Sequence, residues 1–116
     1  MPIFPPRAKG TQTRALAALA VLVLLAASCA RTLERASHRY QHDRDYASLE
    51  TITRSLHVGM SKAEVEALLG PPVYSPTDGQ YNYSSTREDR ILVVDYRLND
   101  QLTDRLQQFD LMTVGP

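Results

Sequence analysis

The distribution of apolar and polar residues divides the chain into four segments of different character. Residues 15–27 form an unbroken apolar run, and residues 31–45 are polar and charged with only two large apolar side chains. Residues 46–69 carry apolar side chains three or four positions apart, which is the spacing of one helix face. Beyond Pro72 the spacing becomes two, as in half-buried strands. The pattern predicts an apolar leader, a polar tether, a helical region and then a sheet.

The helical region predicts two amphipathic helices. The first covers residues 46–56, where the apolar side chains share one face: Tyr46, Leu49, Ile52 and Leu56. The second starts at Ser61, which with Glu64 three positions later forms the pattern of a capping box. Met60 and Val65 occupy the two positions of a hydrophobic staple.

The second helix also has an encoded stop and a predicted solvent face. Gly70 can adopt the positive φ that ends many helices, and Pro71 prevents continuation. Lys62 and Glu66 are expected to pair at i, i+4 on the solvent side. We interpret the motif residues as structure-makers rather than contacts: Gly59, Met60, Ser61, Glu64, Gly70 and Pro71.

Three antiparallel strands are expected after the helices. A turn at residues 77–79 precedes residues 80–84, which place Tyr81 and Tyr83 on one face. Residues 91–98 alternate most clearly, and Asn99-Asp100 turns the chain. Residues 101–109 fit both a strand and a helix, and the short turn before them favours a strand. The fold class is therefore α+β, in the order α-α-β-β-β, with two helices packed on a three-stranded antiparallel meander.

The leader has the parts of an export signal. Three basic residues precede an apolar run that is shorter than the roughly 20 residues of a spanning helix. The run ends at Ala26-Ala27-Ser28-Cys29, which resembles the lipobox of bacterial lipoproteins. Cleavage between Ser28 and Cys29 would remove residues 1–28 and leave an acylated Cys29 as a membrane anchor. An uncleaved anchor and a plain secretory signal are the alternatives.

The charge and cysteine content of residues 29–116 limit the kinds of partner that the mature protein is expected to bind. The basic residues in the leader have no acidic counterpart there, so residues 29–116 contain ten basic and thirteen acidic residues, a net charge of −3. This balance disfavours nucleic-acid binding. Cys29 is the only cysteine, so no disulfide is available within the chain. Ala30 after the cysteine favours the periplasmic face of the outer membrane, because an aspartate there tends to retain lipoproteins at the inner membrane.

Residues 29–45 are expected to form the acylated N-terminus and a polar tether before a domain at residues 46–112. Four arginines of the tether could contact anionic lipid headgroups, and a merely soluble spacer is the alternative: Arg31, Arg35, Arg39 and Arg44. His38 and His42 have a helical spacing that suits a metal ion, but no third ligand is evident. No metal or cofactor is predicted.

The residues of the second helix resemble a known family. Residues 56–65 (LHVGMSKAEV) and 69–72 (LGPP) are similar to the helix-turn signature of the SmpA/OmlA (BamE-like) small outer-membrane lipoproteins. Residues 81–83, 92–96 and 100–102 fall where that family places strands and a turn. The resemblance covers about residues 46–110, with tyrosines where the family often has a tryptophan. The same module also occurs in β-lactamase-inhibitor-like proteins.

The resemblance implies a non-enzymatic, membrane-anchored accessory of outer-membrane β-barrel assembly or envelope integrity. Such a protein acts by binding, possible partners being subunits of the assembly machinery, and Tyr81 and Tyr83 are candidate contacts because tyrosine is favoured at interfaces. No nucleophile elbow, carboxylate pair or metal motif organises the chain's polar residues, so catalysis is not expected. The alternative is a lipoprotein with the same module that acts as an inhibitor or ligand-binding protein.

Overall fold

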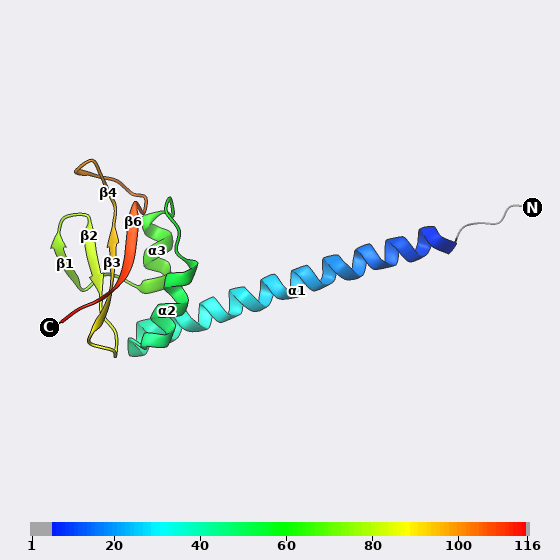
Figure 1. The fold of residues 1–116 in the computed structure, drawn as a ribbon, viewed down its shortest axis with the longest axis horizontal. Helices are drawn as coiled ribbons and strands as arrows, with labels where there is room; N and C mark the ends of the chain where they lie inside the picture. Colours follow the sequence, from blue (N-terminus) through cyan, green and yellow to red (C-terminus); the bar gives the residue numbers. More distant parts are fainter. Residues whose placement is uncertain (1–5, 116) are drawn as a thin grey trace, which may run out of the picture. The chain divides into compact units, whose positions relative to one another are not determined.

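The computed structural model describes residues 6–115 of the chain, which divides into two units at residues 1–32 and 33–116. The first unit is helical from Pro6 onward, as part of α1 (Pro6–Asp43) (Figure 1). Within Ala17–Asp43 an 18-residue window reaches a mean hydropathy of 1.7, which is sufficient for a membrane span by length and composition alone. A signal sequence near the N-terminus meets the same criterion. The first five residues of the predicted leader lie outside the described residues.

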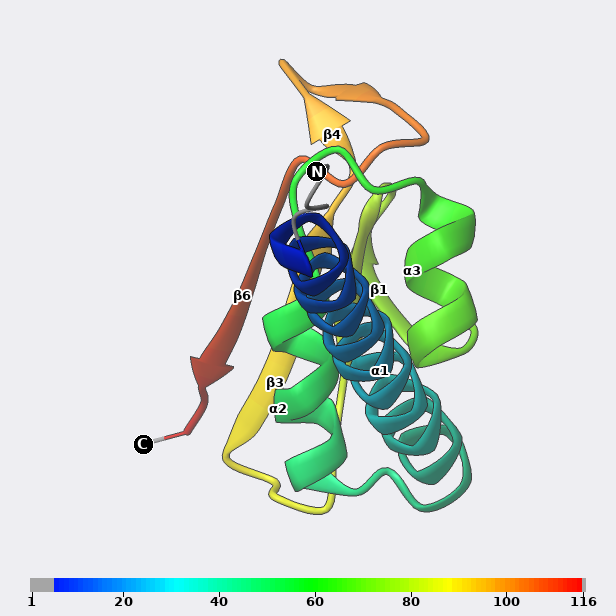
Figure 2. The same cartoon turned by 90° about the vertical axis from the view of Figure 1, so that its right-hand side faces the viewer.

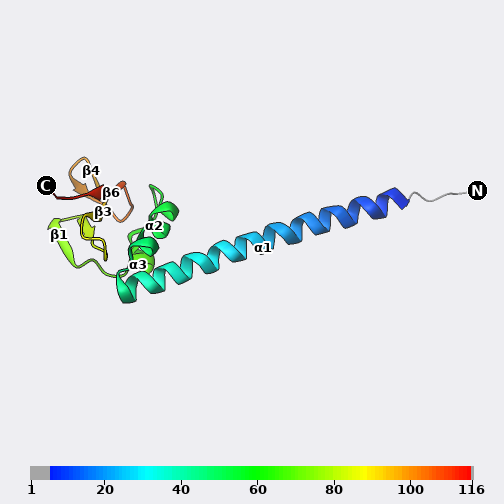
Figure 3. The ribbon, with the colours of Figure 1, turned by 60° about the horizontal axis from the view of Figure 1, so that its bottom comes forward.

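The second unit contains helices followed by an antiparallel sheet, which confirms the predicted α+β class. After the end of α1 come α2 (Tyr46–Ser55) and α3 (Lys62–Leu69). The sheet has the order β1-β2-β3-β6, formed by β1 (Tyr74–Thr77), β2 (Gln80–Tyr83), β3 (Arg90–Asp95) and β6 (Gln108–Thr113). A separate hairpin pairs β4 (Arg97–Leu98) with β5 (Gln101–Leu102). Helices α2 and α3 lie on one side of the sheet (Figures 2 and 3).

One hydrophobic core joins the helices to the helix-facing side of the sheet. Its helical members include the predicted buried positions Leu49, Ile52 and Val65, which are fully buried. The strands contribute residues that alternate along β2 and β3, as a pleated strand requires. The complete cluster is Ala36, Tyr40, Leu49, Ile52, Leu56, Met60, Val65, Leu69, Tyr83, Leu92, Val94, Tyr96 and Leu106.

The end of α1 belongs to this core, so the predicted tether over residues 29–45 is too long. Tyr40 is 0 % exposed, and its hydroxyl donates to the Ser84 carbonyl at 2.6 Å. Ser37 Oγ donates to the Leu68 carbonyl at 2.7 Å, and Gln41 Nε2 reaches the carbonyls of residues 67 and 68. These side chains satisfy carbonyls at the C-terminal end of α3 that have no partner within that helix. The domain therefore begins near Leu33 rather than at residue 46.

The sheet also differs from the predicted three-stranded meander, because four strands form it. The additional strand, β1, contains Pro76 and has no buried residue, so it left no alternating signal in the sequence. Residues 101–109 are neither one strand nor a helix. Their start pairs within the β4–β5 hairpin, Leu106 enters the core, and the sheet strand β6 begins only at Gln108. The predicted strand over residues 91–98 is also too long: β3 ends at Asp95, and Leu98 is 53 % exposed.

Candidate functional site

The candidate lipidation site lies just before the folded domain in the sequence. Cys29 is an exposed free thiol, and the neighbouring Ser28 and Ala30 are exposed as well. Only three residues separate Cys29 from Leu33, where the second unit begins. A chain of this length spans at most about 14 Å when fully extended. Any lipid on Cys29 would therefore hold the domain close to a membrane surface.

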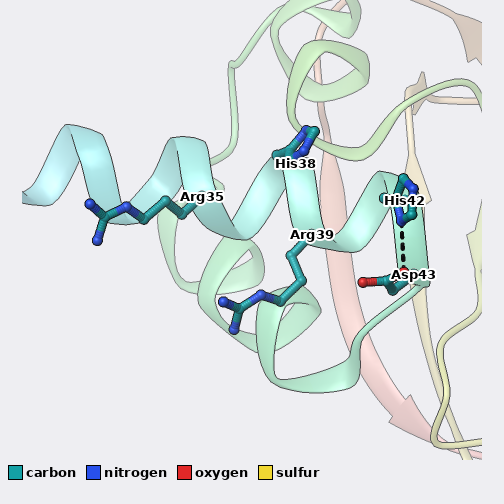
Figure 4. Close-up of a pocket in the computed structure, with 5 residues that line it drawn as sticks. All are labelled: Arg35, His38, Arg39, His42 and Asp43. Carbon is teal, nitrogen blue, oxygen red and sulfur yellow. Dashed lines mark hydrogen bonds and ion pairs between the residues drawn. The ribbon is translucent and has the colours of Figure 1, made fainter.

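The exposed face of the last turns of α1 forms an open basic groove. The groove has a volume of about 260 Å³ and is lined by Arg35, His38, Arg39, His42 and Asp43 (Figure 4). All five residues are exposed, and His42 Nδ1 lies 2.7 Å from Asp43 Oδ1. Among the described residues, neither arginine of the groove has a carboxylate partner within 4.0 Å. The groove thus offers to an anion such as a phosphate two guanidinium groups that form no ion pair within 4.0 Å among the described residues.

The two arginines point the same way along the helix. In Figure 4 the guanidinium groups of Arg35 and Arg39 both extend towards the N-terminal end of the helix. Long helical side chains take this direction because the alternative rotamer would clash with the preceding turn. Of the arginines predicted to contact headgroups, Arg44 is different, because its guanidinium packs 5.1 Å from the centre of the Tyr40 ring. The basic groove is therefore built from Arg35 and Arg39, four residues apart.

The two histidines of the groove have no third metal ligand beside them among the described residues. The rings of His38 and His42 are tilted with their centroids 6.3 Å apart. Within the part of the chain that the structure describes, no three His, Cys, Asp or Glu residues group in a way that could hold a metal ion. Two ligands fall short of the three or four protein ligands that zinc sites use.

The capping motif of α3 has the structural role predicted from the sequence. Ser61 Oγ accepts a hydrogen bond from the Glu64 amide at 3.0 Å, and the same hydroxyl donates to Glu64 Oε1 at 3.0 Å. Glu64 thus closes the motif through the serine side chain rather than through the Ser61 amide. Met60 and Val65 are both buried in the core, as the staple requires.

The two glycines of the motif both adopt positive φ, at +96° for Gly59 and +80° for Gly70. Gly70 is the C-cap of α3, and its amide donates to the Glu66 carbonyl at 2.7 Å. A Cβ at Gly70 would lie 3.2 Å from Gln41 Oε1, so the end of α1 also packs closely here. Pro71 follows as an exposed helix stop.

The start of α3 is also held by a contact that the sequence pattern does not reveal. The amide of Gly59 donates to the Leu106 carbonyl, the Leu106 amide donates to the Met60 carbonyl, and the Lys62 amide donates to the Asp104 carbonyl. These bonds tie the motif to a segment more than forty residues away in the sequence. No local signal predicts them, because they depend on how the chain returns after β5.

Tyr83 is not a surface contact, which corrects one of the two predicted partner residues. Its side chain is 2 % exposed, and its hydroxyl donates to the Gly70 carbonyl at 3.2 Å. Tyr81 shares the helix-facing side with Tyr83 and is half-buried. Its ring meets the Tyr96 ring edge-on at 5.8 Å. Both tyrosines therefore serve the core.

Lys62 lies over this aromatic group instead of pairing with Glu66 as predicted. Its Nζ donates to Tyr81 Oη at 3.1 Å and lies 4.9 Å from the centre of the Tyr81 ring. The hydrogen bond to the phenol raises the pKa of Lys62 above its ordinary value. No Lys62–Glu66 ion pair within 4.0 Å occurs among the described residues. The cation–π contact replaces the i, i+4 pair.

Exposed apolar side chains also lie beside two turns of the domain. Val73 and Tyr74, at the start of β1, are 80 % and 60 % exposed. Leu98 and Leu102 flank the tip of the β4–β5 hairpin, where Asn99 and Asp100 both have positive φ. No surface role is predicted for these residues from the sequence. Their only sequence signal is their position beside Pro and Asn-Asp turn residues.

Comparison of the chain with models of protein families, with curated proteins and with solved structures found no match. The resemblance to the SmpA/OmlA lipoproteins therefore stays a prediction based on the residues that carry it.

Proposed function

We propose that the mature protein is a lipid-anchored binding module at the periplasmic face of the outer membrane. Acylation of Cys29 after removal of residues 1–28 supplies the anchor, and residues 33–116 supply the binding domain. The observation that carries this proposal is the short chain between the two: three residues separate the candidate acylated cysteine from the first residue of the folded unit. The domain is then confined to within about 14 Å of its lipid.

The basic groove supports the same arrangement. Arg35 and Arg39 are exposed, lack carboxylate partners within 4.0 Å among the described residues, and follow Cys29 by less than three turns of helix. Each basic side chain near an anionic surface contributes about 1 kcal/mol to association. Acyl chains and arginines together would therefore orient the end of α1 towards the membrane. The sheet would then be free to meet partners.

The function of the anchored domain is binding, as an accessory of outer-membrane β-barrel assembly or envelope integrity. Confinement to one surface raises the effective concentration of the domain towards partners held there, so modest contacts suffice. The motif from Gly59 to Pro71 that resembles the SmpA/OmlA lipoproteins supports this class of function. The capping residues of this motif have structural roles, which are compatible with a binding function carried by other residues.

Affinity purification from detergent-solubilised envelopes tests this function. The tagged full chain should recover core subunits of the barrel-assembly machinery, and the Cys29→Ala chain should recover less because it lacks the anchor. Reproducible absence of those subunits, with a different protein enriched, would instead favour an inhibitor or ligand-binding lipoprotein.

A further inference from the structure

The basic groove at the end of α1 is rich in hydrogen-bond donors. Its lining consists of Arg35, His38, Arg39, His42 and Asp43. Among the described residues, the one hydrogen bond within this lining joins His42 Nδ1 to Asp43 Oδ1 at 2.7 Å, and neither guanidinium group nor the His38 ring has a partner. A guanidinium group has five N–H donors and no acceptor. The unpaired groups of the groove therefore fit a ligand that supplies acceptors.

Two carboxylates of this region are both engaged by other groups. Asp43 is in contact with His42. Asp45 lies near enough to Arg39 for the two charges to interact, but its Oδ2 accepts from the Ser48 amide at 3.0 Å and from the Ser48 hydroxyl at 2.7 Å. Neither carboxylate forms an ion pair with Arg39 within 4.0 Å. The acceptor for the guanidinium groups is therefore left to a ligand.

Arg35 and Arg39 can reach one ligand together. Residues four apart are neighbours on a helix surface, with Cβ atoms roughly 5–6 Å apart. Both guanidinium groups extend towards the N-terminal end of the helix (Figure 4). Each can donate two parallel N–H bonds to a pair of phosphate oxygens. If both bind one phosphate in this way, the phosphate must offer at least three free oxygens, one of which is shared.

A terminal phosphate meets this requirement and a phosphodiester does not. A phosphate monoester has three free oxygens and a charge of about −1.5 to −2 at pH 7. A diester has only two free oxygens and a single charge, because its phosphorus is linked on both sides. All the residues that line the groove are exposed, so a terminal phosphate can enter end-on.

We propose that the basic groove binds the terminal phosphate of a membrane lipid whose headgroup is a phosphate monoester. Arg35 and Arg39 share its three oxygens, and the imidazole groups of His38 and His42 lie beside it as further donors. A lipid is favoured over a soluble phosphate because three residues separate Cys29 from the folded unit. The proposal names the lipid class for the membrane contact of the proposed function, and it rests on that anchor.

Nuclear magnetic resonance of the histidine side chains tests the proposal on the full chain in phosphatidylcholine bicelles at fixed pH. The chain has three histidines, and the exposed His57 lies outside the groove. Phosphatidic acid, a monoester lipid, should shift the His38 and His42 signals saturably and leave His57 unchanged. Phosphatidylglycerol, a diester, should need about fivefold more lipid for half of the shift, because it carries less charge. Equal half-points for the two lipids, or a His57 signal that moves with the others, would overturn the proposal.

A matched pair of variants locates the phosphate in the groove. Arg39→Gln should raise the phosphatidic acid needed for half of the shift by about fivefold. Arg54→Gln removes the same charge from an exposed position of α2 and should leave the half-point unchanged. Both substitutions are at exposed positions, where changes in stability are small. Equal half-points for the two variants would contradict the site.

A soluble monoester separates the two sources of phosphate. If glycerol 3-phosphate shifts the His38 and His42 signals and phosphatidic acid does not, the lipid is excluded and the occupant is a soluble phosphorylated ligand. Absence of a shift with either compound would also overturn the proposal.

The anchor and the groove can be tested independently. In detergent solution, the full-length Cys29→Ala chain should give the same titration with glycerol 3-phosphate as the wild type, because the groove does not contain the cysteine. Different titrations would contradict a phosphate site confined to the groove. Failure of lipidation would leave this result intact, and failure of phosphate binding would leave the labelling of Cys29 intact.

Discussion

The Ser61 side chain makes two hydrogen bonds with Glu64 at the start of α3. Its hydroxyl accepts from the Glu64 amide and donates to the Glu64 carboxylate, each at 3.0 Å. The serine hydroxyl thereby pairs the Glu64 amide, which has no partner within the helix, and also orients the Glu64 side chain. Because α3 has only eight residues, its first turn is a large part of the helix.

Replacing Ser61 by alanine should lower the free energy of unfolding by about 1 kcal/mol. Ser61→Thr is the matched control, since threonine retains the capping oxygen, and it should lose at most a few tenths of that. Urea unfolding of the three proteins measures both effects. Equal midpoints for Ser61→Ala and the wild type would mean that the cap does not contribute.

Asp95 is a buried carboxylate whose charge is balanced by a residue two positions away. Its two oxygens accept from Arg97 Nε at 3.0 Å and Arg97 Nη2 at 2.9 Å, and Oδ1 also accepts from the Arg97 amide. The hydrogen bonds from the Arg97 side chain hold the pKa of Asp95 below its ordinary value. The pair lies where β3 ends and the β4–β5 hairpin begins.

Because the folded-state pKa is lowered, Asp95 stabilises the fold above the unfolded pKa of about 3.9 and loses this effect as the pH falls through its folded pKa. Asp95→Asn should therefore cost about 2 kcal/mol at neutral pH and progressively less below about pH 4. Urea unfolding at neutral and acidic pH compares the two. If the difference in free energy of unfolding between the wild type and Asp95→Asn stays constant with pH, the charge of Asp95 is not its source.

At the level of elements, the end of α1 is a structural helix of the domain. Its buried face is narrow, with Leu33, Ala36 and Tyr40 at spacings of three and four among charged neighbours. Tyr40 fills the core, and Ser37 and Gln41 cap α3. The end of α1 from Leu33 onward is thus part of the fold rather than a spacer.

Tyr40→Ala should destabilise the domain by about 3 to 5 kcal/mol, as expected for removal of a buried aromatic side chain. His42→Ala lies two residues away on the exposed face and should change stability by less than about 0.5 kcal/mol. Thermal unfolding followed by circular dichroism distinguishes the two. Similar small losses for both variants would restore the tether interpretation.

The features that could be predicted from the sequence are those that short stretches specify by themselves. Ser61, Glu64 and Gly70 define α3 through bonds within one or two turns, and the buried face of α2 follows from its spacing. Features that depend on distant partners could not be predicted. β1 forms only because β2 is beside it, and the motif at Gly59 meets Leu106 only after the chain has returned.

The residues of the candidate site also divide into those whose local sequence predicts their exposure and those whose position depends on distant parts of the chain. The exposure of Cys29 and of Arg35 agrees with what their sequence context predicts. Tyr83 could not be assigned, because alternation shows that Tyr81 and Tyr83 share a face but not which face the helices cover. Here the helices cover that face, so Tyr83 is buried and Tyr81 is half-buried against the core.

At the scale of the whole molecule, we expect the basic groove to contact the membrane. In the chain without residues 1–28, Arg35→Gln combined with Arg39→Gln should weaken binding to vesicles containing an anionic phospholipid by roughly twenty- to thirtyfold, at about 1 kcal/mol per arginine. The matched control is Arg54→Gln with Arg105→Gln, which removes the same charge from exposed positions outside the groove. Cosedimentation at low and high salt measures binding. Equal losses in both double variants would show only a dependence on net charge.

The central claim is that Cys29 is acylated and that the domain works from that anchor. Metabolic labelling with a fatty-acid analogue, followed by mass spectrometry of the purified protein, tests it most directly. We expect the wild-type chain to be labelled and to begin at residue 29, and Cys29→Ala to carry no label. A labelled Cys29→Ala chain, or an unlabelled wild-type chain that still contains residues 1–28, would contradict it.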